Sequence, residues 1–148
     1  MIRKVNIYVI MEAVESDKLF AEYFEEGKTQ LLNDFKVNKE TYYTLSNMKM
    51  LDAYGVFDED KLVGFIIAST SESPHYSTLV TTIMSFFVSK KYRKFGTAKD
   101  LLANIESDAI KKGSKTLIIS SPYEAVLGKF VSKIGFKPTH ILYGKDLK

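Results

Sequence analysis

The sequence predicts a mixed α+β fold, and two stretches carry this prediction. Residues 53–57 and 61–68 are rich in β-forming side chains and flank a short polar turn, which is typical of a hairpin. Residues 78–88 form a nearly continuous apolar run that suits a central strand covered on both faces. A helical pattern and a short buried strand at 116–119 follow, and this order implies a parallel, right-handed crossover.

The first fifty residues supply further elements. Alternating apolar side chains predict a strand over 5–11. Two helices follow, and each opens on a polar residue suited to capping, Ser16 and Asn38. They are expected to end at Gly27 and Met48, and the segment between them fits a short helix or a loop. The aromatic residues of both helices, Tyr23 and Tyr42 among them, are predicted to pack in the core, and the alternative is that some of them line a groove for the acceptor.

The second half can be divided by its turn and cap residues. Gly113 ends one helix, and Ser121 with Pro122 can open another, because proline is favoured at the first helical position. The expected elements here are a loop over 71–77, a helix over 98–112, a strand over 116–119, a helix over 122–134 and a strand over 139–147.

The turn after residue 88 combines small residues with positive charge. Residues 93–98 read Arg-Lys-Phe-Gly-Thr-Ala, with further lysines at 90, 91 and 99. The first backbone N–H groups of a helix lack partners within it, and the helix dipole makes them attractive to anions. Gly96 and Ala98 would let a phosphate approach the backbone closely. The turn is therefore a candidate diphosphate site, and a solvated basic helix entry is the alternative.

Residues 93–98 match the R/Q-x-x-G-x-G/A turn of the GCN5-related N-acetyltransferases (GNAT), which this chain resembles. Val63-Gly64 and Gly135-Phe136 extend the resemblance, which covers residues 53–148 in register. It implies a single GNAT domain over residues 1–148. The sheet of such a domain is central and mostly antiparallel, its fourth and fifth strands form a parallel, splayed pair, and helices cover both faces.

The resemblance also implies acetyl-coenzyme A as co-substrate, with its diphosphate in the turn. The pantetheine arm would lie along the end of the fourth strand and contact the main chain of Phe86 and Val88. The Val88 N–H is the candidate to polarise the thioester carbonyl, as in an oxyanion hole. The residues predicted to contact the co-substrate are Phe86, Phe87, Val88, Arg93, Lys94, Phe95, Gly96, Thr97, Ala98, Lys99 and Ser121.

The proton-transfer residues usual in the family are not matched. No acidic residue lies between His75 and Asp100, so the glutamate of the fourth strand has no counterpart. The tyrosine expected four residues before Gly135 is replaced by Val131. A water chain could replace a dedicated base. The candidates for catalysis are Val88, Tyr123, Tyr143 and His75, with Ser121 and Glu72 as further substitutes.

Composition narrows the class of protein. The chain has 148 residues, 45% of them hydrophobic, which suffices for one domain with a real core. A net charge of +3 gives little support for nucleic-acid binding, and the absence of cysteine excludes disulfides and thiolate metal sites. With only two histidines, a metal site is not expected. Neither a membrane span nor a signal-peptide cleavage site is apparent, so a cytoplasmic location is expected.

The main hypothesis is an N-acetyltransferase that moves an acetyl group from acetyl-coenzyme A to a primary amine. Acidic residues between Glu12 and Glu26 would suit a cationic acceptor, either a small molecule or a protein or peptide amine. One alternative is a catalytically weak GNAT-fold protein that binds coenzyme A or an acyl-coenzyme A in sensing or protein interaction. A second alternative is a basic domain that binds nucleic acid or another polyanion. Members of the family commonly form dimers, so the resemblance is compatible with a homodimer of this chain.

Overall fold

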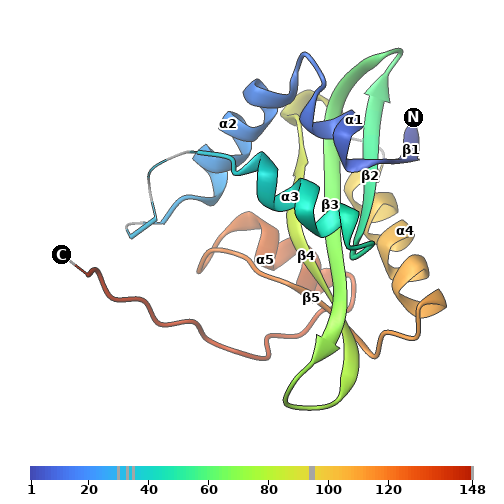
Figure 1. Cartoon of the computed structure of the whole chain (residues 1–148). Helices are drawn as coiled ribbons and strands as arrows, with labels where there is room; N and C mark the ends of the chain where they lie inside the picture. Colours follow the sequence, from blue (N-terminus) through green and yellow to red (C-terminus); the bar gives the residue numbers. More distant parts are fainter. Residues whose placement is uncertain (30, 33, 35, 94–95, 148) are drawn as a thin grey trace.

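Figure 1 shows the computed structural model of the chain, which describes residues 1–29, 31, 32, 34, 36–93 and 96–147. Within these residues the strands form one sheet in the order β1-β2-β3-β4-β5. The first four are antiparallel neighbours, and β4 pairs with β5 in parallel, which confirms the predicted α+β class. The strands are β1 (Ile2–Val5), β2 (Leu51–Asp58), β3 (Lys61–Ser73), β4 (Thr78–Val88) and β5 (Thr116–Ile119).

Helices cover both faces of the sheet, as predicted (Figure 1). On one face, α1 and α2 bury Ile10 and Phe20 against Phe65 of β3. On the other face, α4 and α5 bury Leu101 and Val131. Two hydrophobic clusters therefore share one sheet, and the central strands β2 and β3 send side chains into both of them. The helices are α1 (Ile7–Met11), α2 (Ser16–Gly27), α3 (Lys39–Asn47), α4 (Thr97–Lys111) and α5 (Val126–Lys133), and a 3₁₀ turn, η1, spans Lys90–Tyr92.

The predicted strand over 5–11 is wrong for most of its length. β1 ends at Val5, and α1 begins directly after Asn6, whose side chain accepts a hydrogen bond from the Tyr8 N–H. The buried side chains of α1 are Ile7, Ile10 and Met11, which recur at helical spacing. The apolar pattern was compatible with both periods, and the asparagine cap decides in favour of the helix.

The predicted bounds of the other early elements need smaller corrections. Asn38 caps α3 as expected, and its side chain accepts from the Thr41 N–H at 3.2 Å. Ser16, however, lies within the first turn of α2, and its buried hydroxyl has no described hydrogen-bond partner. The loop predicted over 71–77 is shorter, because β3 continues to Ser73 and pairs there with Thr78.

The end of the chain differs most from its prediction. α5 begins at Val126 rather than Pro122, because Glu124 adopts a φ of 59°, which a helix cannot include. No described residue of 139–147 belongs to a strand. A strand needs the backbone of a neighbour, and β5 pairs only with β4 among the described residues. Ile141, Leu142 and Tyr143 are accordingly exposed. The C-terminal segment runs as an extended trace outside the sheet (Figure 1).

β4 contains one residue more than its neighbour requires. Ile67 pairs with Ser85 and Ala68 pairs with Ile83, so Met84 is the extra residue of a β-bulge. β5 pairs with β4 only over Val80–Ile83, directly before this bulge. The rest of β4, from Met84 to Val88, therefore pairs with no described strand on the β5 side.

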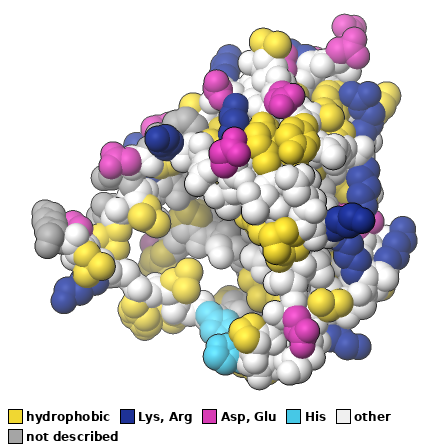
Figure 2. All heavy atoms as spheres, in the orientation of Figure 1, with side chains coloured by type: hydrophobic (Ala, Val, Ile, Leu, Met, Phe, Trp, Pro, Cys, Tyr) yellow, Lys and Arg dark blue, Asp and Glu magenta, His cyan; other side chains and the backbone are white. Residues whose placement is uncertain are grey.

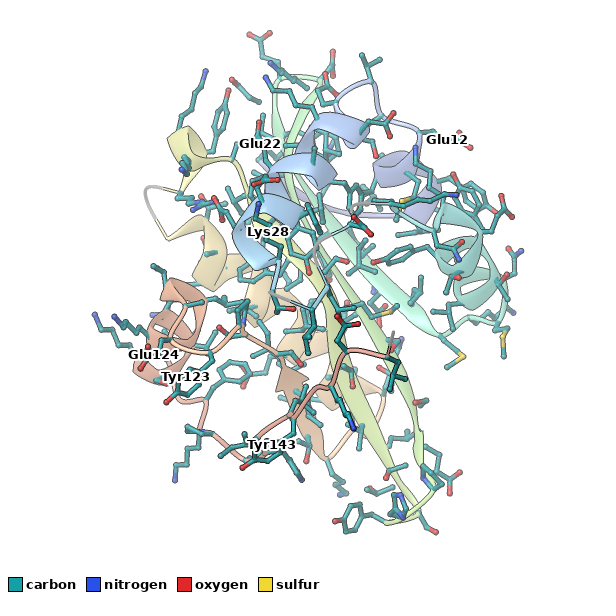
Figure 3. The ribbon with its side chains drawn as sticks, turned by 90° about the vertical axis from the view of Figure 1, so that its left-hand side faces the viewer. Glu12, Glu22, Lys28, Tyr123, Glu124 and Tyr143 are labelled. Carbon is teal, nitrogen blue, oxygen red and sulfur yellow. The ribbon has the colours of Figure 1, made fainter. Side chains whose placement is uncertain are left out.

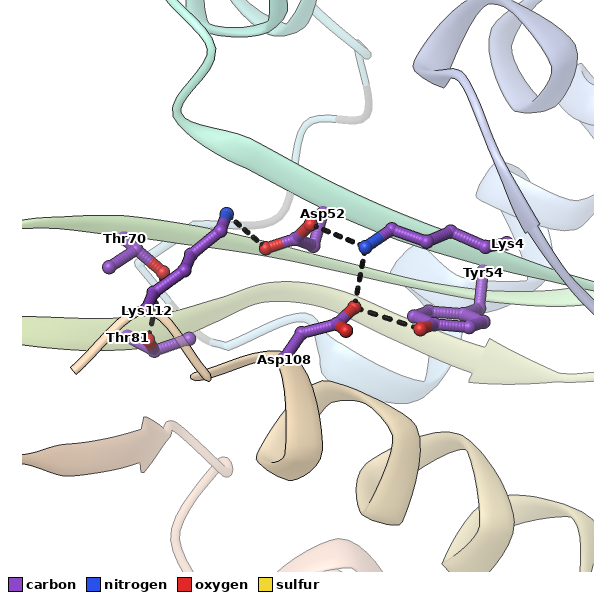
Figure 4. Close-up of polar contacts among 7 residues, drawn as sticks. All are labelled: Lys4, Asp52, Tyr54, Thr70, Thr81, Asp108 and Lys112. Atoms are coloured by element: carbon purple, nitrogen blue, oxygen red, sulfur yellow. Dashed lines mark hydrogen bonds and ion pairs between the residues drawn. The ribbon is translucent and has the colours of Figure 1, made fainter. Parts of the chain in front are cut away.

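A network of charged groups fixes the C-terminal end of α4 to the sheet (Figure 4). Lys4 Nζ lies 2.8 Å from Asp108 Oδ2 and 3.0 Å from Asp52 Oδ1. The Tyr54 hydroxyl donates to Asp108 at 2.8 Å, and Lys112 pairs with Asp52. The hydrogen bond to Asp108 is the main cause that raises the pKa of Lys4. Burial acts to raise the pKa of Asp108, but the bonds from Lys4 and Tyr54 outweigh it and lower that pKa.

The Tyr54 phenol should make folding stability depend on alkaline pH. Burial, with the hydrogen bond to Asp108, raises the pKa of Tyr54 from 10.0 to about 12. Its contribution to stability is therefore complete below pH 10 and is lost as the pH rises toward 12. We expect urea unfolding of Tyr54→Phe to show a smaller loss of free energy over this window than the wild type. Tyr76→Phe, at an exposed hairpin position, should behave like the wild type. Equal losses in all three proteins would contradict this assignment.

Candidate active site

The part of β4 beyond its bulge presents an open edge. The Ser89 N–H donates to the Val63 carbonyl of β3 at 2.9 Å, and Val88 stands opposite Gly64. In an antiparallel pair, backbone groups alternate in direction, so the N–H and C=O of Phe86 and Val88 point away from β3. They face the side that β5 leaves after Ile83. An extended ligand could pair with this edge as an added strand would.

The side chains of the same residues belong to the core. Phe87 is buried in the cluster beneath α1 and α2, and Val88 is buried in the cluster beneath α4 and α5. Phe86 is half-buried against the second cluster. Their expected contribution to a ligand is consequently limited to the main chain.

The predicted turn leads into α4 through a glycine. Gly96 stands at the N-cap position with a φ of 78°, a left-handed conformation that favours glycine. No side chain caps this end among the described residues. A Cβ built on Gly96 would meet no described protein atom within 4 Å. Thr97, Ala98 and Lys99 form the first turn of α4, whereas Lys94 and Phe95 lie outside the described residues.

Arg93 contacts the protein itself. Its Nε donates to the Val88 carbonyl at 2.6 Å. One terminal nitrogen donates to both carboxylate oxygens of Glu26, at 2.7 and 2.8 Å. The charge that was predicted to face the diphosphate is thus paired with an acidic side chain of α2.

A polar contact in the first cluster connects β4 to the early helices. The Tyr42 hydroxyl lies 2.5 Å from the buried Ser85 Oγ, and the Tyr23 ring packs edge-on against Phe87 of the same strand, with 6.3 Å between the ring centres. Burial raises the pKa of both phenols, and Ser85 opposes the shift. Both tyrosines therefore remain protonated at neutral pH and can donate hydrogen bonds.

Tyr23 and Tyr42 also line a cavity of about 360 Å³ next to α2. Its size lies within the range of small-molecule sites. Aromatic side chains form its inner wall, and polar side chains stand at its rim. The described lining consists of Phe20, Tyr23, Phe24, Gly27, Lys28, Leu32, Asp34, Lys36, Val37, Asn38 and Tyr42.

Two predicted proton-transfer residues lie far from the open edge. His75 occupies the β3–β4 turn, and Glu72 pairs with Leu79 at the start of β4. At about 3.3 Å per residue, the nine steps from Leu79 to Val88 span about 30 Å. Neither side chain can reach a group bound at Val88 in this arrangement.

The other candidates lie around α5 and the C-terminal segment (Figure 3). Tyr123 is 92% exposed and Tyr143 is 90% exposed, on separate segments. The Ser121 hydroxyl donates to the Pro122 carbonyl at 3.1 Å, and it stands 3.3 Å from a Cβ built on Gly128. The structure therefore does not bring Val88, Tyr123, Tyr143 and His75 together into one constellation.

The acidic early segment is partly neutralised by basic partners. Arg93 pairs with Glu26, Lys28 lies 2.9 Å from Glu25, and Lys39 lies 3.2 Å from Asp17. Acidic and basic side chains are interspersed over this part of the surface (Figure 2). Within the described part of the chain, no group of three His, Asp or Glu residues could hold a metal ion, and no helix could cross a membrane.

Sequence reasoning missed the polar partners of β4. It placed Tyr23 and Tyr42 in the core, with an acceptor groove as the alternative, and assigned no role to Ser85. It counted Glu26 only among the acidic residues that would suit a cationic acceptor. A buried tyrosine hydroxyl usually requires a hydrogen-bond partner, and this was an available signal. The partner itself could not be deduced, because it depends on how α2 and α3 lie across the sheet.

Family comparison agrees with the resemblance seen in the sequence. The model of the family described as acetyltransferase (GNAT) domain matches residues 16–143. A comparison with curated proteins gives no match.

Several solved structures share the fold over nearly the whole chain. The ribosomal-protein-alanine N-acetyltransferase from Brucella melitensis biovar Abortus 2308 is 19% identical, with a TM-score of 0.71 and 99% of each chain covered. The aminoglycoside acetyltransferase meta-AAC0020 from an uncultured soil metagenomic sample, in complex with sisomicin, is 15% identical. Its TM-score is 0.75, and 100% of this chain and 96% of that chain are covered. The aminoglycoside N-acetyltransferase AAC(6′)-Iy in complex with CoA is 17% identical, with a TM-score of 0.71 over 100% of this chain and 99% of that chain.

Proposed function

The chain belongs to the acetyltransferase (GNAT) family, and we propose that it transfers the acetyl group of acetyl-coenzyme A to a primary amine. The observation that carries this proposal is the open edge of β4, which ends next to the glycine-led start of α4. An extended thioester arm and a diphosphate need two such features side by side. The expected location is the cytoplasm.

The described residues fit acetyl-coenzyme A through their main chain. The N–H groups of Phe86 and Val88 point to the side on which the pantetheine arm would lie. The start of α4, from Gly96 to Lys99, would receive the diphosphate. When bound, the co-substrate supplies an activated acetyl group, and the chain's own task is to orient it.

In the proposed reaction, the amine nitrogen attacks the thioester carbonyl carbon, the carbon–sulfur bond breaks, and coenzyme A leaves as its thiolate. The proton that the amine loses passes to water. The Val88 N–H would stabilise the oxyanion that forms on the carbonyl oxygen. Because His75 lies about 30 Å away along β4, we assign proton removal to water rather than to that side chain. Tyr123 and Tyr143 could act only after the exposed segments that carry them move toward the edge.

The acceptor is proposed to enter from the side of α2, where the cavity of about 360 Å³ lies. Its aromatic inner wall can contact an alkyl or ring portion, and the protonated phenols of Tyr23 and Tyr42 can donate to polar groups. A small amine fits this volume more readily than a folded protein surface does. A protein could still insert a single terminal or side-chain amine.

Two measurements test this function together. Calorimetry should detect acetyl-coenzyme A binding, and a thiol-release assay should detect turnover over a panel of amines. The panel would contain sisomicin, a peptide that begins with alanine, spermidine and free lysine. Binding with amine-dependent thiol release supports the proposal. Binding without release from any amine favours the alternative, a coenzyme A-binding protein with a sensing or protein-interaction role, and absence of binding rejects both.

A further inference from the structure

The Arg93 side chain contacts both β4 and α2, and its backbone directly follows η1. It follows η1 in the proposed cofactor turn, but its side chain lies back along β4. Its Nε bonds to the Val88 carbonyl, and its terminal nitrogen bonds to Glu26 near the end of α2. The guanidinium also lies 5.3 Å from the centre of the Phe87 ring, within the range of a cation–π contact.

We propose that Arg93 is a positioning residue that shapes the open edge of β4, and that it does not hold the diphosphate. The proposal rests on the proposed function, because it concerns how that edge receives the co-substrate. The Val88 carbonyl faces the open side, where a strand would otherwise pair with it. Arg93 satisfies this carbonyl and so fixes the last peptide unit of the edge, directly after the Val88 N–H.

Glu26 gives the guanidinium its orientation. Both carboxylate oxygens contact one terminal nitrogen, which leaves Nε aimed at Val88. A half-exposed ion pair contributes little by itself. A charge-assisted bond from a held guanidinium to a carbonyl is worth more, and it depends on the guanidinium staying in place. Removing Glu26 should therefore loosen the edge, although the described hydrogen bonds of Glu26 are to Arg93 and not to β4.

A second contact fixes the same helix to the same strand. Tyr23 precedes Glu26 by three residues, so the two side chains lie on one face of α2. The Tyr23 ring packs edge-on against the ring of Phe87, the residue before Val88 on β4, with 6.3 Å between the ring centres. α2 is thus attached at two points along the open part of β4. These attachments set the position of the α2 wall of the cavity relative to the thioester.

The two possible roles of Arg93 make opposite predictions for two probes. S-acetylpantetheine carries the thioester arm without the diphosphate, and acetyl-coenzyme A carries both. A phosphate ligand would matter only for acetyl-coenzyme A. A positioning residue matters equally for both, because both would use the edge of β4.

The test measures dissociation constants of both probes by calorimetry for the wild type, Arg93→Ala, Arg93→Lys and Glu26→Ala. We expect each variant to bind both probes about tenfold more weakly. Lysine keeps the charge but lacks the planar fork that bridges two acceptors, so Arg93→Lys should not rescue binding. The double variant Glu26→Ala with Arg93→Ala should be no weaker than Arg93→Ala alone, because the two residues act as one unit.

Neighbouring residues supply matched controls. Glu25→Ala removes an adjacent carboxylate of α2 that pairs only with Lys28 among the described residues, and Lys90→Ala removes a positive charge from η1. Both should retain wild-type affinity for both probes. The positioning role is overturned if Arg93→Ala weakens only acetyl-coenzyme A while Glu26→Ala has no effect or tightens it. It is also overturned if the variants bind like the controls. A wild-type protein that binds neither probe would reject the proposed function, and the positioning role with it.

Discussion

Gly96→Asp should weaken acetyl-coenzyme A binding at least about tenfold, equivalent to about 1.4 kcal/mol. The new carboxylate would stand at the start of α4, where no side chain caps the helix among the described residues. It would compete with the diphosphate for the same N–H groups and repel its charge. The loss should appear as a higher dissociation constant in calorimetry at moderate ionic strength.

Gly113→Asp provides a matched control at the other end of the same helix. Gly113 has a φ of 83°, close to the 78° of Gly96, and a Cβ there would likewise meet no described atom within 4 Å. The control therefore carries the same backbone strain and the same new charge. We expect it to melt at a lower temperature and to keep wild-type affinity. If the folded Gly96→Asp protein binds as tightly as Gly113→Asp, the turn is not the diphosphate site.

Gly64→Ala should cost about 1–3 kcal/mol of folding stability and also weaken acetyl-coenzyme A. Gly64 stands opposite Val88, and its new Cβ would lie 2.9 Å from the Phe87 carbonyl oxygen and 3.1 Å from the Val88 Cα. These are backbone atoms, which cannot rotate away as a side chain can. The end of β4 must shift, and the proposed oxyanion donor shifts with it.

Urea unfolding and calorimetry measure the two effects of Gly64→Ala separately. Gly27→Ala is the control, since Gly27 ends α2 and a Cβ there meets nothing within 4 Å. Alanine is the better helix former, so this variant should be neutral or slightly more stable. Wild-type stability and affinity in Gly64→Ala would show that the strand end tolerates displacement and that its placement is not critical.

The sequence predicted the second half of the sheet well because its patterns are local. The bounds of β4 and β5 agree with prediction, since long apolar runs and flanking turn residues mark them. The parallel pairing followed from the intervening helix. The strand prediction for residues 7–11 failed because these five residues, most of them apolar, fit both the period of a strand and that of a helix. Only the Asn6 cap distinguishes the two.

The candidate site was predictable only where it depends on the main chain. The main-chain role of Phe86 and Val88 was predicted from the family resemblance, and β5 indeed stops pairing with β4 at Ile83. The start of α4 was predicted from Gly96 and the helical pattern after it. Side-chain partners across the fold had no sequence signal. Arg93 was assigned to a phosphate because of its place in a motif, whereas its contacts depend on α2, which is 67 residues away from it at Glu26.

The surplus residue Met84 also determines which way β4 turns its polar groups. Ile83 packs toward α4, whereas Ser85, two positions later, faces Tyr42 on the opposite side of the sheet. Without the bulge, these two side chains would share one face. Deleting this one residue would restore a regular ladder of hydrogen bonds and let β5 pair with more of β4. It would also turn the Ser85 hydroxyl away from Tyr42. The open edge of β4 thus depends on one extra residue, Met84. A homologue without this residue would have to separate β4 from β5 by other means.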